Sequence, residues 1–172
     1  PSAWVTVFAL AWSMVASILF LRTRKLVFDD HAVTAAELGL LFCIGATVSG
    51  ALWAKAMWGS YWNWDPRQTS IALAILFYGA YLTLRGAMED PEARARISSA
   101  YWVLGLVVAP FLFFILPRLA AFSLHPKPAG AEMDAKIGIV VVTSIVAHLL
   151  LFFWITNLRQ RLLALEEEAE DL

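Results

Sequence analysis

Long stretches without a charged residue dominate the pattern of apolar and polar positions along this chain. Five of them lack Asp, Glu, Lys and Arg, at residues 1–21, 38–54, 68–84, 97–117 and 137–158. A helix rises 1.5 Å per residue, so about 20 apolar residues cross the ~30 Å hydrocarbon core of a bilayer. The two shorter stretches suffice if flanking charged side chains reach the headgroup layer. The pattern predicts an all-α bundle of five membrane-spanning helices, at about residues 1–21, 36–56, 68–85, 97–118 and 137–158.

The distribution of basic residues predicts which ends of these helices face the cytoplasm. Segments 22–37 and 85–96 share one side with the tail from residue 159, and together they carry eight Lys and Arg residues against five on the other side. Short loops rich in Lys and Arg tend to remain in the cytoplasm. We therefore expect outer loops at residues 55–67 and 118–136 and a cytoplasmic acidic tail at residues 159–172. His31 would be a solvated residue of the first inner segment.

Composition and missing motifs narrow the function classes. The 172 residues are 60% hydrophobic and 16% charged, with a net charge of −1, which argues against a nucleic-acid binder. One Cys excludes a Cys-rich zinc site, a C-x-x-C redox pair and a C-x-x-C-H haem attachment sequence. A small-solute transporter would need acidic or basic side chains near the middle of the membrane, but the charge-free stretches offer only His148. The sequence also contains no hydrolase motif, which argues against an intramembrane hydrolase.

Tryptophan is concentrated in the first outer loop, where three of the eight Trp residues fall within positions 58–64. An aromatic belt at the membrane interface accounts for isolated tryptophans, namely Trp4, Trp102 and Trp154. For the loop, a second interpretation is a shelf on which a flat apolar ligand stacks. If the segment is helical, one face carries Trp58, Tyr61, Trp62 and Asp65. The residues alone leave both interpretations open.

The end of this loop also predicts a helix start. Asp65, Pro66 and Gln68 form a capping box, with Asp65 as N-cap and Pro66 at the first helical position. Asp90 and Pro91 predict a second such start. Arg67 lies in the first turn, where the helix dipole disfavours a cation. Its presence there indicates an anionic partner, either Asp65 or a ligand carboxylate.

The segment from Trp58 to Pro66 resembles the tryptophan-rich WWD motif of the cytochrome c assembly membrane proteins, a family that handles haem. Chain size, short loops and the approach Ala54-Lys55-Ala56-Met57 favour its six-span CcmC branch, whereas Tyr61 and Pro66 also occur in the larger CcsA branch. A CcmC-like chain implies a sixth span in the natural protein and a haem carrier rather than an enzyme. A CcsA-like chain implies a haem channel and cytochrome c synthase subunit.

The resemblance implies a haem b site on the outer face. Imidazole is a standard axial ligand of haem iron, and His125 of the second outer loop matches the family's second histidine ligand. The family's first histidine ligand would stand immediately before Pro1. The porphyrin and its propionates would meet the residues of the first outer loop and one arginine of the second, namely Trp58, Tyr61, Trp62, Trp64, Asp65, Arg67 and Arg118.

Partners and location follow from the same resemblance. It implies a CcmE-like haem chaperone as acceptor, the CcmA and CcmB transporter subunits, CcmD, and a bacterial inner membrane with the haem site facing the periplasm. His148 lies in the middle of the last span. It is either a structural histidine bonded within the bundle or an intramembrane haem ligand of the CcsA kind.

Overall fold

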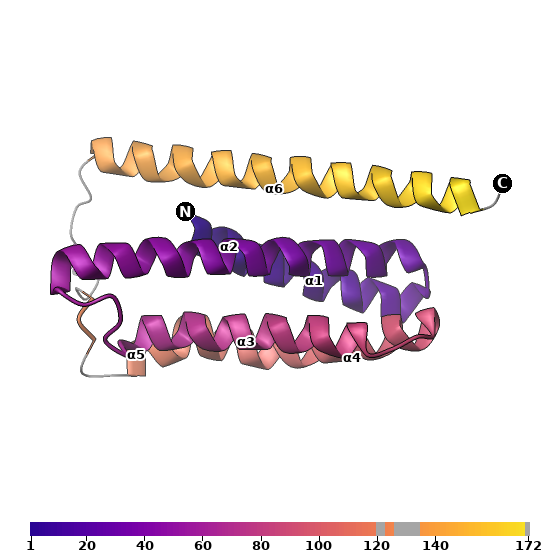
Figure 1. The fold of residues 1–172 in the computed structure, drawn as a ribbon, viewed down its shortest axis with the longest axis horizontal. Coiled ribbons are helices and arrows are strands. Elements are labelled where there is room, and N and C mark those ends of the chain that lie inside the picture. Colours follow the sequence, from indigo (N-terminus) through magenta and orange to yellow (C-terminus); the bar gives the residue numbers. More distant parts are fainter. Residues whose placement is uncertain (120–122, 126–134, 171–172) are drawn as a thin grey trace.

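The computed structural model describes residues 1–119, 123–125 and 135–170 and is helical nearly throughout (Figure 1). Five helices are long and apolar enough to cross a membrane, which confirms the predicted all-α class. The fourth of them passes through a π-helical turn and a short terminal helix. The elements are α1 (Ser2–Thr23), α2 (Leu26–Trp58), α3 (Pro66–Gly86), α4 (Pro91–Pro110), η1 (Phe111–Ile115), α5 (Leu116–Leu119) and α6 (Ala135–Glu170).

The helices run up and down, and short connections join α1 to α2, α2 to α3 and α3 to α4. Helix α1 packs most extensively against α2 and α4, and α3 packs against α2 and α4, so these four helices form the bundle. Helix α6 runs along the outside of α2, and its main contacts in the described structure are with α1 and α2 (Figure 1). Only 6% of the most apolar 18-residue window of α6 is buried, so this helix exposes most of its apolar surface. We call the end where α2 joins α3 the cavity end, and the end where α1 joins α2 the tail end.

Both predicted helix starts are present. The Asp65 carboxylate accepts a hydrogen bond from the Arg67 N–H, and the Asp90 carboxylate accepts one from the Ala93 N–H. Each aspartate is followed by a proline at the first helical position. Such caps satisfy backbone donors that the first helical turn leaves unpaired.

The inner segment expected at residues 22–37 is mostly helical. Only Arg24 and Lys25 lie outside helices, and α2 already begins at Leu26. The first turn of α2 is fixed to α3, because Asp29 forms a bidentate ion pair with Arg85 of α3, at 2.8 and 2.6 Å. The expectation that His31 is a solvated loop residue was wrong, because His31 lies half-buried on α2 with its ring 6.5 Å from that of Trp12.

Trp102 was expected in an interfacial belt, and that expectation was also wrong. Its side chain is fully buried on α4. The rings of Tyr78 and Tyr81 lie 5.5 and 4.8 Å from it, so Trp102 is the centre of the aromatic core.

The fourth membrane-spanning segment stays helical through Pro110. Proline lacks a backbone N–H, and the chain accommodates this because the helix widens into the η1 turn directly after Pro110.

Candidate functional site

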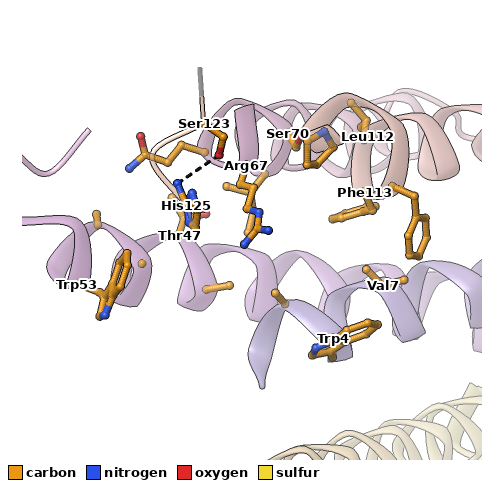
Figure 2. A pocket seen from close by; sticks show the side chains of 18 of the residues that line it. Trp4, Val7, Thr47, Trp53, Arg67, Ser70, Leu112, Phe113, Ser123 and His125 are labelled. Atoms are coloured by element: carbon orange, nitrogen blue, oxygen red, sulfur yellow. Dashed lines mark hydrogen bonds between the residues drawn. The ribbon is translucent and has the colours of Figure 1, made fainter. Parts of the chain in front are cut away.

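A cavity of about 870 Å³ opens at the cavity end of the bundle, between α1, α2, α3 and the η1–α5 segment. That volume lies within the range of roughly 300–1,000 Å³ that small-molecule sites span. Figure 2 shows Arg67 and His125 extending toward α1 and α2, whose Trp4 and Trp53 lie on the opposite side. The aromatic residues of the lining come from α1, α2, η1 and the loop after α2, and they are Trp4, Trp53, Trp58, Trp62, Phe113 and Phe114.

The structure brings five of the eight expected site residues to this cavity, namely Trp58, Trp62, Arg67, Arg118 and His125. The other three lie beside it. Tyr61 is 56% exposed under the Lys55 ammonium, which sits 5.4 Å from its ring. Trp64 is 71% exposed and meets Trp62 edge to face at 5.7 Å. Asp65 is buried behind the lining.

The tryptophan-rich loop is not helical. Helix α2 ends at Trp58, Gly59 adopts φ 78°, and residues 59–65 form an irregular loop. Trp64 also has a left-handed backbone, at φ 56°, which is uncommon for a residue with a side chain. Gln68 secures the loop, because its side chain accepts a hydrogen bond from the Asn63 N–H at 2.8 Å. The conditional expectation of one helical face for this loop therefore does not apply.

Two lining tryptophans were not among the expected site residues. Trp4 looked like a belt residue, and Trp53 lies in the last part of a charge-free stretch where nothing distinguishes it from a lipid-facing residue. Trp53 packs edge to face against Trp58 at 5.0 Å. The two positions are five apart along α2, which is not the spacing of one helical face, so only the tertiary structure reveals the pair.

Asp65 joins the two loops of the cavity end. One carboxylate oxygen accepts hydrogen bonds from the Arg67 N–H and from His125 Nδ1, each at 2.9 Å. The other accepts the Ser123 hydroxyl at 2.9 Å and the Leu124 N–H at 2.7 Å. Burial alone would raise the pKa of Asp65, but these hydrogen bonds and the His125 charge together hold that pKa below its usual value. The carboxyl group is therefore ionised at neutral pH.

His125 is held by its environment on several sides. Because an ionised carboxylate is only an acceptor, His125 Nδ1 carries the proton in the bond to Asp65. In a neutral ring the Nε2 atom then has a lone pair available for a ligand bond. The ring stacks on Trp53 with centroids 6.1 Å apart and meets Trp58 edge to face at 4.9 Å.

Two arginines line the cavity without a carboxylate partner among the described residues. Only the backbone N–H of Arg67 bonds to Asp65, so the guanidinium is left pointing into the cavity (Figure 2). Arg118 donates to the Phe114 carbonyl at 2.6 Å, which positions its side chain along the η1–α5 wall. The sequence predicted either Asp65 or a ligand carboxylate as the anionic partner of Arg67. The Asp65 carboxylate does not pair with the Arg67 side chain.

The other two histidines lie away from this cavity, whose lining includes only His125. His148 Nδ1 donates to the Ser144 carbonyl of its own helix at 2.7 Å, and its ring lies 5.9 Å from that of Phe42. In the described part of the chain, no group of three or more His, Cys, Asp and Glu residues could hold a bare metal ion.

Comparison with known proteins agrees with this geometry. The family model described as "CcmC: Heme exporter protein C" matches residues 1–172. Curated relatives with the name "Heme exporter protein C" occur in Bradyrhizobium diazoefficiens (32% identity over 158 residues), Rhodobacter capsulatus (35% over 121) and Paracoccus denitrificans (29% over 168). These alignments cover 88%, 70% and 94% of this chain, but 59%, 48% and 68% of the respective relatives. The chain therefore belongs to the heme exporter protein C, or CcmC, family.

Proposed function

We propose that this chain binds haem b in the cavity and transfers it to a haem chaperone during cytochrome c maturation. Haem is the cargo of this process. The observation that carries the proposal is His125, a histidine whose Nδ1 is bonded to a buried carboxylate while the ring lies on the wall of a tryptophan-lined cavity. The names of the relatives support it, because each is called a heme exporter protein.

The residues around the cavity match the three chemical parts of haem. The indoles of Trp58 and Trp62 offer flat apolar surfaces for the porphyrin. The Nε2 atom of His125 suits the iron. The guanidinium groups of Arg67 and Arg118 suit the two propionates, since arginine pairs readily with carboxylates. The chain would bind, orient and release haem, and it would catalyse no covalent step itself.

We propose that a second axial ligand comes from the residue or residues before Pro1, as the resemblance to the family implies. The position of Pro1 supports this, because Pro1, Ser2 and Trp53 line a smaller recess of about 300 Å³. Trp53 belongs to the cavity wall as well, so a segment leading into Pro1 would pass beside the cavity.

We further propose that the cavity end faces the periplasm and the tail end the cytoplasm of a bacterial inner membrane. The tail end carries more of the basic residues, including Arg22, Arg94 and Arg161. Of the basic residues assigned to the outer side, Lys127 lies outside the described residues. The proposed partners are a CcmE-like chaperone, CcmA and CcmB transporter subunits and CcmD.

A transfer experiment tests the proposal. Membranes that contain this protein together with a CcmE-like chaperone are supplied with haem, and the haem covalently held by the chaperone is measured by its peroxidase activity. We expect His125→Ala to abolish loading of the chaperone and the matched variant His31→Ala to leave it intact. Undiminished loading by the His125→Ala protein, at equal amounts in the membrane, would contradict the proposed function.

A further inference from the structure

The contacts of Asp65 exceed what a helix cap requires. An ionised carboxylate offers about four acceptor positions, and all four are filled in Asp65. Only the bond from the Arg67 N–H belongs to the cap of α3. The other three come from residues 123–125, about 60 positions further along the chain, and the Asp65 side chain has no exposed surface.

Asp90 provides a matched comparison within the same chain. It caps α4 in the same way, with one hydrogen bond from the Ala93 N–H, and it lies exposed at the tail end. A cap therefore needs neither burial nor three further bonds. The additional bonds of Asp65 all converge on the short segment that carries His125.

We propose that Asp65 is the positioning residue of the His125 ligand. Asp65 keeps the proton on Nδ1 of His125, directs Nε2 to the cavity, and makes the imidazole a stronger electron donor to iron. Asp65 itself does not contact the cargo, because its four acceptor positions are occupied and it lies behind the lining. This inference rests on the proposed function, since it assumes that His125 meets the iron.

The physical basis is the polarisation of a ligating histidine by a carboxylate. A carboxylate bonded to the second ring nitrogen fixes the tautomer and ring orientation and raises the basicity of the ligating nitrogen, and its loss commonly weakens metal binding by about 10–100-fold. Here the backbone is fixed too, because Leu124 N–H and the Ser123 hydroxyl bond to the same carboxylate. Trp53 and Trp58 restrict rotation of the ring. The ligand is thus oriented before haem arrives, which lowers the entropic cost of binding.

The first test needs no change at Asp65. Nitrogen-15 NMR of histidine-labelled protein without haem reports which ring nitrogen of each histidine carries the proton, and His125→Ala identifies the signal of His125. We expect the Nδ1–H tautomer for His125 near neutral pH. A neutral ring with its proton on Nε2, or a rapidly exchanging mixture of the two tautomers, would overturn the proposal.

The second test is a double-mutant cycle on haem binding. We expect Asp65→Asn to raise the haem Kd by about 10–100-fold and to raise the iron reduction potential, with Asp90→Asn changing neither. In the His125→Ala background, Asp65→Asn should cause no further loss. Additive losses, or an unchanged potential in folded Asp65→Asn protein, would overturn the proposal.

The outcomes separate this inference from the proposed function. If His125→Ala leaves the haem Kd unchanged, the proposed function fails. If His125→Ala weakens binding while Asp65→Asn does not, only the positioning role fails. Should Asp65→Asn protein not fold, as judged by circular dichroism and gel filtration, the tautomer measurement on unaltered protein decides the question.

Discussion

The two ends of the helical bundle use the same residue types in opposite ways. At the tail end, Arg85 is paired with Asp29 at 2.6 Å, and the aromatic side chains of Tyr81 and Trp102 are fully buried. At the cavity end, Arg67 has no ion pair within the described part of the chain, and Trp62 lies on the wall of a cavity of about 870 Å³. At the tail end the arginine is therefore paired with a carboxylate and the aromatic side chains pack on one another, whereas at the cavity end both kinds of side chain line an open space.

This difference supports the proposal that the cavity end, and not the tail end, binds a ligand. A buried charge without a partner is costly, so the tail end has to satisfy Arg85 from within the protein. Arg67 is exposed and therefore keeps its hydration without a partner. Tryptophan content alone does not distinguish the ends, because Trp102 is buried in the core while Trp62 lies on the cavity wall.

The largest loss of stability is expected when one partner of the Asp29–Arg85 ion pair at the tail end is removed. Asp29→Leu removes the carboxylate bonded to the Arg85 guanidinium, whose side chain is 13% exposed, and we expect the free energy of unfolding to fall by about 3–5 kcal/mol. Denaturation by SDS, followed by circular dichroism, measures the loss. The double variant Asp29→Leu with Arg85→Met is the control and should recover most of the stability. Equal losses in both variants would mean that the charge pairing is not the cause.

A comparison of two glycines tests the packing in the middle of the bundle. A Cβ atom added at Gly39 would lie 2.5 Å from the Tyr78 hydroxyl oxygen, and the hydrogen bond from Tyr78 to the Thr6 carbonyl at 2.9 Å holds that ring in place. Overpacking of this kind costs about 1–3 kcal/mol. We expect a loss of stability for Gly39→Ala and none for Gly45→Ala, whose added Cβ meets nothing within 4 Å. The same SDS denaturation separates them, and equal behaviour would contradict the tight contact at Gly39.

At the cavity end, loss of a tryptophan should affect binding and not folding. We expect Trp62→Ala to weaken haem binding by about 1 kcal/mol, or about fivefold, with little change in unfolding. Trp102→Ala should instead destabilise the protein by about 3–5 kcal/mol, because it empties the core. Haem titration gives the haem affinity of each variant, and SDS denaturation gives its stability. A Trp62→Ala protein with unchanged haem affinity would favour the aromatic-belt interpretation of this loop.

The smallest expected effect comes from the exposed arginine. Arg67→Gln should weaken haem binding by about 0.2–1 kcal/mol, because a solvent-exposed ion pair with a propionate contributes little. The loss should shrink as salt is added, since ions screen exposed charges. Haem titrations at low and high ionic strength measure this dependence. A loss that does not change with salt would rule out a charge interaction at Arg67.

The sequence was sufficient for the parts of the fold that depend on local pattern. Charge-free stretches predicted the five long helices, and Asp65 and Asp90 predicted two helix starts. The extent of α2 was missed, because its first turns are stabilised by the distant Arg85. Burial of Trp102 was missed for a similar reason, since an apolar residue in a membrane span looks the same whether it faces lipid or protein.

The candidate site was predictable in its residue types but not in its connections. The motif drew attention to Trp58, Trp62 and Arg67, and all three line the cavity. The bond from His125 to Asp65 joins positions 60 residues apart and depends on how two loops meet, which no local pattern encodes. Trp4 and Trp53 likewise reach the cavity only through the packing of α1 and α2.

The most direct test of the central claim is a haem titration of purified protein that compares the three histidines one at a time. The Soret absorbance is recorded for His125→Ala, His148→Ala and His31→Ala beside the unaltered protein. The account predicts a shifted or missing Soret band for His125→Ala alone, because only His125 lines the cavity. His148 is bonded to its own helix and His31 packs beside Trp12, so both of those variants should bind as the unaltered protein does. An unchanged spectrum for His125→Ala, together with loss of haem from His148→Ala, would contradict the account.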